Sequence, residues 1–389
     1  MILREIEKIL LEKLNYQPVT ALLGPRQVGK TTLVKQIQAK LPQSSVYFDL
    51  ENSRDFQKFQ TDAVTFLESM RNQTVILDEI QHLPALFGDL RGMIDNYRMP
   101  ARFLLLGSAS PALMKNTSES LAGRITYLEM PPLLFRELNQ PDPTLHWLRG
   151  GFPNSFLAPT DAQQQNWFES FVTTYLQQDL PLLGLRANPV LLRRFLMMLA
   201  SIQGNLLNQS TLANSLAIKN SLVSQFLDFF ENAFLMRRLQ PYFTNIGKRI
   251  VKTPKVYIRD SGLLHHLLNL HDYPTLIGHA VCGGSWEGYV IEQIVTLLPY
   301  QSLPFFYRTQ DGAELDLVIE TGLRISVAVE IKLSNTPILS KGNTVALQDV
   351  GNPPLLVITP SASDYQMKPN VWVCSVKTLP ENLQRLGVF

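Results

Sequence analysis

The stretch Gly24-Pro25-Arg26-Gln27-Val28-Gly29-Lys30-Thr31-Thr32 fills every position of the pattern G-x-x-x-x-G-K-[ST]. An apolar run, 18–23, precedes it, and a helical pattern, 32–38, follows it. A strand, a glycine-rich loop and a helix in this order form a phosphate-binding loop, because successive backbone N–H groups turn inward around the phosphates. We therefore expect all of these residues to bind a nucleoside triphosphate. The alternative is a glycine-containing turn before a helix, but it does not explain why a strand precedes the loop and a helix follows it.

Two side chains of the loop have separate expected roles. Lys30 is expected to place its charge at the β- and γ-phosphate oxygens, and Thr31 to offer its hydroxyl to Mg²⁺. The sequence therefore predicts a bound nucleotide with its magnesium ion.

A pair of carboxylates supports this interpretation further along the chain. The segment Thr74-Val-Ile-Leu-Asp-Glu79 is a predicted buried strand that ends in two adjacent acids. Asp78 is expected to hold Mg²⁺, and Glu79 to polarise the attacking water. Such a pair is common by chance, but after a phosphate-binding loop it favours a catalytic site. The segment 45–50 lies between the two motif strands and is expected to be one inserted strand, which is the arrangement of ATPases that keep a catalytic glutamate on the strand ending in Asp78 and Glu79.

Two further residues are candidates for the same site. The predicted strand 101–110 ends in small polar residues, so Ser108 is expected to reach the γ-phosphate or the water, because ligands meet the carboxyl ends of parallel strands. The alternative is a helix cap, since Ser110 precedes Pro111. Arg124 is a candidate arginine finger for a neighbouring subunit, which predicts a homo-oligomer, or else the cap of a surface strand.

These motifs and several later segments carry a family resemblance. The strings are GPRQVGKTTL (24–33), VILDEIQ (75–81), LLLGSAS (104–110), SLAGRI (120–125), PLLFREL (132–138), GGFP (150–153), YLQQDL (175–180), PKVYIRDSGL (254–263), GAELD (312–316) and VEIK (329–332). With them the chain resembles the prokaryotic AAA+ ATPases in which a P-loop domain precedes a domain of unknown function. The resemblance covers nearly the whole chain. It implies ATP as the nucleotide and ATP hydrolysis as the activity, and it implies no biological role.

Composition narrows the class of protein. The 389 residues are enough for two to four domains, and 45% hydrophobic against 17% charged residues is typical of a soluble globular chain. A net charge of +2 gives no global attraction to nucleic acid, so any such surface must be local. The two cysteines, Cys282 and Cys374, are typical of a reducing compartment. No signal peptide and no apolar stretch long enough to span a membrane is recognised, so we expect a cytoplasmic protein without a membrane partner.

The predicted fold class is α/β in four parts. Residues 1–132 are expected to form an AAA+ P-loop ATPase core, 133–186 a helical lid, 187–279 a winged-helix domain and 280–389 a PD-(D/E)XK nuclease-like domain with the restriction-endonuclease-like α/β fold. The winged helix is predicted from helical patterns at 190–202, 211–216 and 222–234, followed by extended segments at 235–243 and 249–258.

A basic stretch accompanies the predicted wing. Between 237 and 259 the chain has seven cationic residues and no acidic one: Arg237, Arg238, Lys248, Arg249, Lys252, Lys255 and Arg259. Such a stretch can neutralise several phosphates, which makes DNA or RNA a candidate partner. Winged helices also join proteins, and basic edges also deter strand pairing, so a surface without nucleic acid is the alternative.

The C-terminal part contains the second candidate site. Asp316 is on one predicted strand, Glu330 and Lys332 share one face of the next, and Glu287 is on the helix before them. This arrangement resembles the D…E-x-K signature of PD-(D/E)XK nucleases, in which the acids bind Mg²⁺ and the lysine orients the attacking water. The alternative is an ordinary ion pair between Glu330 and Lys332.

The remaining candidates and the overall hypothesis follow from these motifs. His265, His266 and His271 lie among leucines at helical spacing, which favours an amphipathic helix over a metal site. The hypothesis for the chain is an AAA+ ATPase that controls a DNA- or RNA-facing activity of its C-terminal domains. The alternative is an ATP-dependent switch or scaffold that binds a protein partner and has a non-cleaving nuclease-like fold.

Overall fold

The computed structural model describes residues 2–110, 121–139, 142–243 and 250–389. The chain forms two compact units. The first unit comprises Met1–Leu133, Thr173–Ala187 and Phe226–Leu235, and the second comprises Leu134–Val172, Asn188–Gln225 and Met236–Phe389. The compact units therefore divide the chain differently from the predicted four-part organisation, because the predicted lid and the predicted winged helix each contribute segments to both units.

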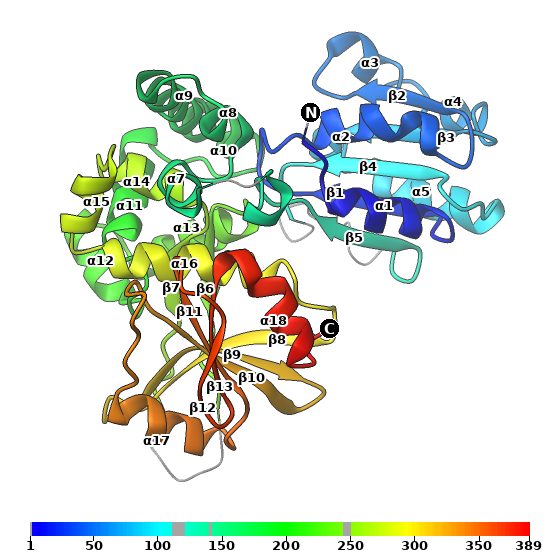
Figure 1. The fold of residues 1–389 in the computed structure, drawn as a ribbon. Helices are drawn as coiled ribbons and strands as arrows, with labels where there is room; N and C mark the ends of the chain where they lie inside the picture. Colours follow the sequence, from blue (N-terminus) through cyan, green and yellow to red (C-terminus); the bar gives the residue numbers. More distant parts are fainter. Residues whose placement is uncertain (1, 111–120, 140–141, 244–249) are drawn as a thin grey trace. The chain divides into compact units, whose positions relative to one another are not determined.

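The first unit is built on a parallel five-stranded sheet in the order β2-β3-β4-β1-β5. The strands are β1 (Val19–Leu23), β2 (Ser45–Asp49), β3 (Thr74–Asp78), β4 (Phe103–Gly107) and β5 (Ile125–Glu129), and they run from blue to teal in Figure 1. The strands β1, β3 and β4 are buried along their whole length, which explains their continuous apolar sequences.

The sheet order corrects one expectation. The segment 45–50 forms the edge strand β2 beside β3, and the strand that lies between β3 and β1 in the sheet is β4. Strand neighbours in a parallel sheet depend on how the crossovers wind, which the order along the chain does not specify. The consequence is that β4 carries Ser108 to a position next to the acidic end of β3.

Helices complete the first unit. They are α1 (Ile6–Leu14), α2 (Lys30–Ile37), α3 (Ser53–Gln57), α4 (Ala63–Glu68), α5 (Leu86–Asn96), a π-helical turn (Tyr175–Asp179) and α10 (Leu180–Leu182), with short 3₁₀ turns at Gln38–Lys40 and Ile80–His82. The helix α1 packs against β1, and α3 packs against β2. Apolar residues of β1, β3, β4 and α5 share one core.

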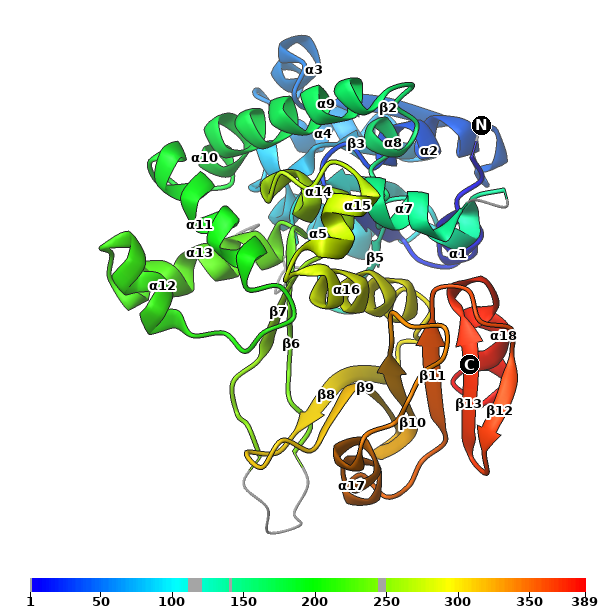
Figure 2. The same cartoon turned by 60° about the vertical axis from the view of Figure 1, so that its left-hand side comes forward.

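The second unit is built on a mixed six-stranded sheet in the order β12-β13-β11-β10-β9-β8. The strands are β8 (Ser302–Arg308), β9 (Glu314–Thr321), β10 (Arg324–Ile331), β11 (Leu355–Thr359), β12 (Tyr365–Lys368) and β13 (Val371–Ser375). The pairs β8–β9 and β9–β10 are antiparallel, and β10–β11 is parallel. Figure 2 shows this order, with α18 (Leu379–Arg385) beside β13.

The second unit also has a short two-stranded ribbon, β6 (Met236–Leu239) and β7 (Lys255–Ile258), and further helices. They are α7 (Pro143–Arg149), α8 (Pro153–Phe156), α9 (Asp161–Thr174), α11 (Pro189–Ser201), α12 (Gln209–Leu216), α13 (Asn220–Asn232), α14 (Ser261–Leu267), α15 (Tyr273–Gly278), α16 (Cys282–Val295) and α17 (Lys341–Asp349), with 3₁₀ turns at Phe135–Glu137 and Val376–Thr378. The last residues of α9 and the second half of α13 belong to the first unit.

The three helices and the ribbon that were predicted as a winged helix are present, with their ends shifted by a few residues. The strands β6 and β7 pair antiparallel over only four residues each. The segment between them includes 244–249, which lies outside the described residues. The winged-helix assignment therefore stays a prediction.

Candidate nucleotide site and carboxylate cluster

The phosphate-binding loop joins β1 to α2 in the predicted way, since α2 begins at Lys30. Gly24 has a φ of 153°, and a Cβ placed on it would lie 2.2 Å from the carbonyl oxygen of Met130. Gly29 precedes α2 in the left-handed conformation, with a φ of 96°. Both positions therefore require glycine, the first because the loop passes directly against the end of β5 and the second because of its backbone conformation.

Lys30 is buried inside this loop. Its Nζ donates hydrogen bonds to the carbonyl oxygens of Gly24, at 2.9 Å, and Pro25, at 2.8 Å. Burial lowers the pKa of Lys30, although the carboxylates of Glu79 and Asp78 act in the opposite direction. The ammonium thus lies within the curve of the loop, where a phosphate group would meet it.

The loop and the acidic strand end meet at Asp78. The hydroxyl of Thr31 donates to Oδ2 of Asp78 at 2.6 Å, and the hydroxyl of Tyr47 donates to the same oxygen at 2.6 Å. Burial and the hydrogen bond to Asp78 raise the pKa of Tyr47, so the phenol keeps its proton. The structure brings Thr31 and Asp78 together as predicted, and it adds Tyr47, which the motif did not reveal.

Glu79 and Ser108 are joined by a residue that the sequence reasoning did not assign. Nε2 of Gln81 donates to Oε2 of Glu79 and, at 3.0 Å, to Oγ of Ser108. Glu79 has a φ of 54°, which is uncommon for a residue other than glycine and is found at functional sites. The side-chain amide of Gln81 therefore holds the Glu79 carboxylate close to the Ser108 hydroxyl. Glu79 is the residue predicted to act on water, and Ser108 is the one predicted to face the γ-phosphate.

Arg26 connects the loop to two acids of the same unit. Its guanidinium donates to Asp179, at the end of the π-helical turn, and at 2.8 Å to Glu51. Asp179 is buried. Sequence reasoning gave Asp179 no role, although it closes the YLQQDL string, because its partner is more than 150 residues away along the chain.

Arg124 is engaged within its own chain. It contacts Asp95 through Nε–Oδ1 at 2.7 Å and Nη2–Oδ2 at 2.9 Å, and it donates to the carbonyl oxygen of Ala122 at 2.9 Å. This bidentate pair corresponds to the alternative of a surface strand cap. A role of Arg124 on a neighbouring subunit stays a prediction.

In the second unit, Asp316 and Glu330 lie on the neighbouring strands β9 and β10, where Leu317 faces Val329. The pairing of β8 with β9 shifts register between Phe305 and Tyr307, opposite Asp316, and such irregularities often re-aim side chains at sites. Nζ of Lys332 contacts Oε1 of Glu330 at 2.6 Å, as predicted for neighbours on one strand face.

The acids of this region influence one another. Burial raises the pKa of Asp316 well above its usual range, and the carboxylates of Glu287 and Glu330 add to this effect. Burial also raises the pKa of Glu330, against the effect of Lys332. The predicted set of Asp316, Glu330, Glu287 and Lys332 therefore forms one electrostatic cluster. We call it, together with Glu314, the carboxylate cluster.

The role of Asp316, Glu330 and Glu287 as metal ligands stays a prediction. Within the described part of the chain, no three His, Cys, Asp or Glu side chains are arranged to hold a metal ion. Instead, Nζ of Lys255 lies 2.8 Å from Oε1 of Glu287 and 2.8 Å from Oε1 of Glu314. Burial opposes the charge of Lys255, but Glu287, Asp316 and Glu314 outweigh it and raise the lysine pKa.

Three cations of the basic stretch have acidic partners within the chain. Lys255 points into the carboxylate cluster, and Arg237 and Arg259 both pair with Glu292, at 2.5 Å and 3.0 Å. Although burial opposes it, these two guanidinium groups lower the pKa of Glu292 to about 2. Lys248 and Arg249 lie outside the described residues, and Lys252 is exposed. The sequence could not reveal this because each neutralising acid lies at least 32 residues along the chain from the cation that it pairs with.

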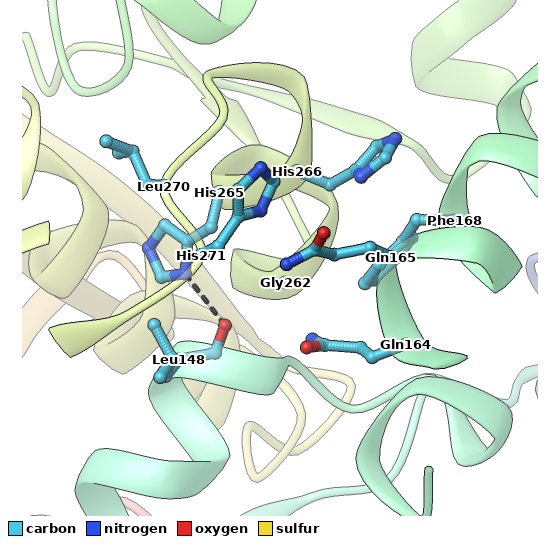
Figure 3. A pocket seen from close by; sticks show the side chains of 9 residues that line it. All are labelled: Leu148, Gln164, Gln165, Phe168, Gly262, His265, His266, Leu270 and His271. Carbon is cyan, nitrogen blue, oxygen red and sulfur yellow. Dashed lines mark hydrogen bonds between the residues drawn. The ribbon is translucent and has the colours of Figure 1, made fainter. Parts of the chain in front are cut away.

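The three histidines border a small polar pocket between α9 and α14, which Figure 3 shows. His265 is buried, with its ring nitrogens at 2.9 Å from the carbonyl oxygen of Leu148 and 2.7 Å from Oγ of Ser285. Burial lowers the pKa of His265 to about 4, so the ring is neutral. His265 and His266 lie on the helix α14, and His271 follows it.

Among the residues described in the structure, no helix is long and apolar enough to cross a membrane.

Models of three domain families match the chain. They are an AAA domain at residues 16–139, a domain of unknown function (DUF8612) at 141–273 and a domain of unknown function (DUF4143) at 282–379. Uncharacterized proteins of Mycobacterium tuberculosis and Mycobacterium bovis are each 39% identical to it over 368 residues, covering 95% of this chain and 82% of theirs. An uncharacterized protein of Haemophilus influenzae is 24% identical over 280 residues, covering 64% of this chain and 69% of its own.

Solved structures with a likeness to the chain include the Walker-type ATPase of Pyrococcus abyssi, with a TM-score of 0.47 and 17% identity over 69% of this chain and 96% of that one. The AMPPCP-bound DnaA from Aquifex aeolicus has a TM-score of 0.30 and 14% identity, over 58% of this chain and 86% of that one.

Proposed function

The chain belongs to one family with its mycobacterial relatives and contains an AAA domain, and on this premise we propose that it binds ATP with Mg²⁺ and hydrolyses it. The observation that supports this most is the contact between the two motifs, in which the Thr31 hydroxyl donates to Asp78 at 2.6 Å with Glu79 as the next residue. Both oxygen donors are of the kind that Mg²⁺ prefers.

Each side chain then has a role in the proposed reaction. Lys30 and the backbone N–H groups of the loop bind the phosphates. Thr31 and Asp78 would hold Mg²⁺, which neutralises charge on the phosphate oxygens when it is bound. Glu79 orients the attacking water and accepts its proton. The hydroxyl of Ser108 donates a hydrogen bond to the γ-phosphate.

Two variants separate ATP binding from hydrolysis. Glu79→Gln keeps the phosphate loop and Asp78, so turnover is expected to fall by roughly 10²-fold or more while ATP affinity persists. Lys30→Ala is expected to weaken ATP binding itself. Phosphate release and fluorescent-nucleotide binding measured on the full chain give both quantities. Unchanged turnover in Glu79→Gln would remove the proposed base.

The second part of the proposal concerns what ATP hydrolysis controls. The carboxylates that pair with Lys255, Arg237 and Arg259 favour an ATP-dependent switch with a protein partner over control of a nucleic-acid activity. DNA titrations at several salt concentrations test this choice, since each phosphate contact contributes about 1 to the salt slope. Equal binding by the parent and by a variant with Lys248, Lys252 and Arg249 replaced by alanine supports the switch. A lower slope in the variant supports nucleic acid.

A homo-oligomer completed by Arg124 is also proposed. If Arg124 acts on the neighbouring subunit, turnover per chain rises with protein concentration, because the site is complete only in the assembly. Mixing Arg124→Ala with Glu79→Gln chains then restores part of the activity. Absence of this complementation leaves Arg124 as the partner of Asp95 alone.

A further inference from the structure

The strand β7 presents two donors to one oxygen of the carboxylate cluster. Lys255 is 3% exposed, and its Nζ lies 2.8 Å from Oε1 of Glu287. The hydroxyl of Tyr257, two residues further along β7, donates to the same oxygen at 2.5 Å. Oε1 of Glu287 is therefore occupied by an ammonium and a phenol from the same strand.

Two other acids of the cluster, Glu314 and Glu330, also have cationic partners. Glu314 contacts Nζ of Lys255 at 2.8 Å through Oε1 and Arg308 at 3.2 Å through Oε2. Glu330 contacts Lys332 at 2.6 Å. The side chain of Lys255 is the most enclosed of these cations, since Lys332 is 32% exposed and Arg308 39%. Lys255 thus brings a positive charge of the chain itself into the carboxylate cluster, where a divalent ion would be expected.

Close packing holds Lys255 in this position. A Cβ on Gly284 of α16 would lie 2.4 Å from the carbonyl oxygen of Gln203, and a Cβ on Gly288 would lie 2.6 Å from the Gln203 amide and 3.0 Å from the Tyr257 ring. The helix that bears Glu287 therefore lies directly against the chain at Gln203 and against β7. Removing Lys255 from the carboxylates would require these tightly packed elements to separate or would leave buried charges unpaired, which is unfavourable.

We propose that the Lys255 ammonium is the resident cation of the carboxylate cluster, and that this domain therefore holds its acids together without a divalent metal and is not a metal-dependent nuclease. The inference goes beyond the ATPase proposal and does not depend on it. It contradicts the reading of Asp316, Glu330 and Glu287 as Mg²⁺ ligands.

The first test uses Mn²⁺ alone, titrated without nucleotide and followed by the EPR signal of the free ion. Both proteins carry Asp78→Asn, which removes the proposed Mg²⁺ ligand of the nucleotide site, and one of them also carries Glu330→Gln. The proposal predicts the same binding curve for both, because the cluster takes up no Mn²⁺. A saturable site that is present in the first protein and lost with Glu330→Gln overturns the proposal, whatever the ATPase activity proves to be.

The second test removes the resident cation. Lys255→Met, also made together with Asp78→Asn, nearly keeps the length of the side chain without its charge, and it is expected to create a saturable Mn²⁺ site that the parent lacks, because Glu287 and Glu314 lose their shared partner. Lys332→Met is the matched control, and we expect a much smaller change from it. A folded Lys255→Met protein without any gain, or an equal gain in both variants, overturns the assignment. If Lys255→Met does not fold, the comparison of Glu330→Gln with its parent decides.

Discussion

The nucleotide site and the carboxylate cluster both gather acidic side chains, the first at the end of β3 and the second on β9, β10 and α16, but these acids have different partners. Asp78 accepts hydrogen bonds from the hydroxyls of Thr31 and Tyr47, which orient it without bringing a positive charge to it. Glu287 accepts from the ammonium of Lys255, which cancels that charge. A carboxylate held by neutral donors is prepared for a cation from solution, whereas a carboxylate held by an ammonium is not.

The largest expected effect comes from removing one acid in each region. Asp78→Asn is expected to lower ATP turnover by roughly 10²-fold or more, because the carboxylate acts on charge at the phosphates. Glu287→Gln is expected to reduce the free energy of unfolding by roughly 1–3 kcal/mol, because it leaves a buried ammonium less well paired. Phosphate release and denaturant unfolding of both variants measure this. A loss of stability without loss of turnover in Asp78→Asn, together with a loss of turnover without loss of stability in Glu287→Gln, would contradict the difference drawn between the two regions.

A smaller effect is expected at the hydroxyl that orients Asp78. Tyr47→Phe removes one donor without removing volume, and partners of metal ligands of this kind contribute roughly 10- to 100-fold in metal affinity. The Mg²⁺ concentration for half-maximal turnover should therefore rise by roughly 10-fold. Tyr127→Phe, on the exposed strand β5, is the matched control and should leave it unchanged.

The amide that joins Glu79 to Ser108 gives a third test. Gln81→Ala frees the Glu79 carboxylate from its fixed orientation, so kcat should fall by roughly tenfold while KM for ATP and the melting temperature change little. Gln57→Ala, on the exposed surface of α3, is the control. A loss of melting temperature equal to the loss of activity would make Gln81 a structural residue only.

Asp260 is a third kind of buried carboxylate, because its partners are backbone N–H groups. Asp260 accepts backbone N–H groups of Gly151 at 2.7 Å and Leu263 at 2.8 Å, and burial raises its pKa to about 6. The folded pKa lies above the unfolded one, so its contribution to stability is present below pH ~4 and lost as the pH rises through ~6. The free energy of unfolding should decrease by roughly 3 kcal/mol over this window.

The corresponding variant checks the origin of this pH dependence. Asp260→Asn cannot ionise, and its remaining oxygen can still accept a backbone N–H. Its free energy of unfolding, measured against pH in denaturant titrations, should therefore be flatter than that of the parent between pH ~4 and ~6. An unchanged slope would assign the dependence to other groups.

The sequence predicted what lies close together along the chain. The phosphate loop, Asp78 and Glu79 were found because strand, loop and helix follow one another within each motif, and the parallel sheet brings their ends together. Glu330 and Lys332 were found by the same local rule, since alternate residues share a strand face.

The partners that were missed depend on contacts far apart in sequence. Tyr47 meets Asp78 only because β2 pairs with β3, and Ser108 meets Gln81 only because β4 lies between β3 and β1. The sequence places Lys255 in the basic stretch, a candidate nucleic-acid surface, because its acidic partners come from α16 and β9, after that stretch has ended. Local pattern alone does not indicate which way a buried lysine points.

The central claim, that divalent metal binds the nucleotide site and not the carboxylate cluster, is tested most directly by Mn²⁺ binding to the full chain in the presence of a non-hydrolysable ATP analogue. The account predicts one Mn²⁺ ion per chain that requires the analogue, is lost in Asp78→Asn and is retained in Glu330→Gln. A Mn²⁺ ion that binds without the analogue, survives Asp78→Asn and disappears in Glu330→Gln would contradict it.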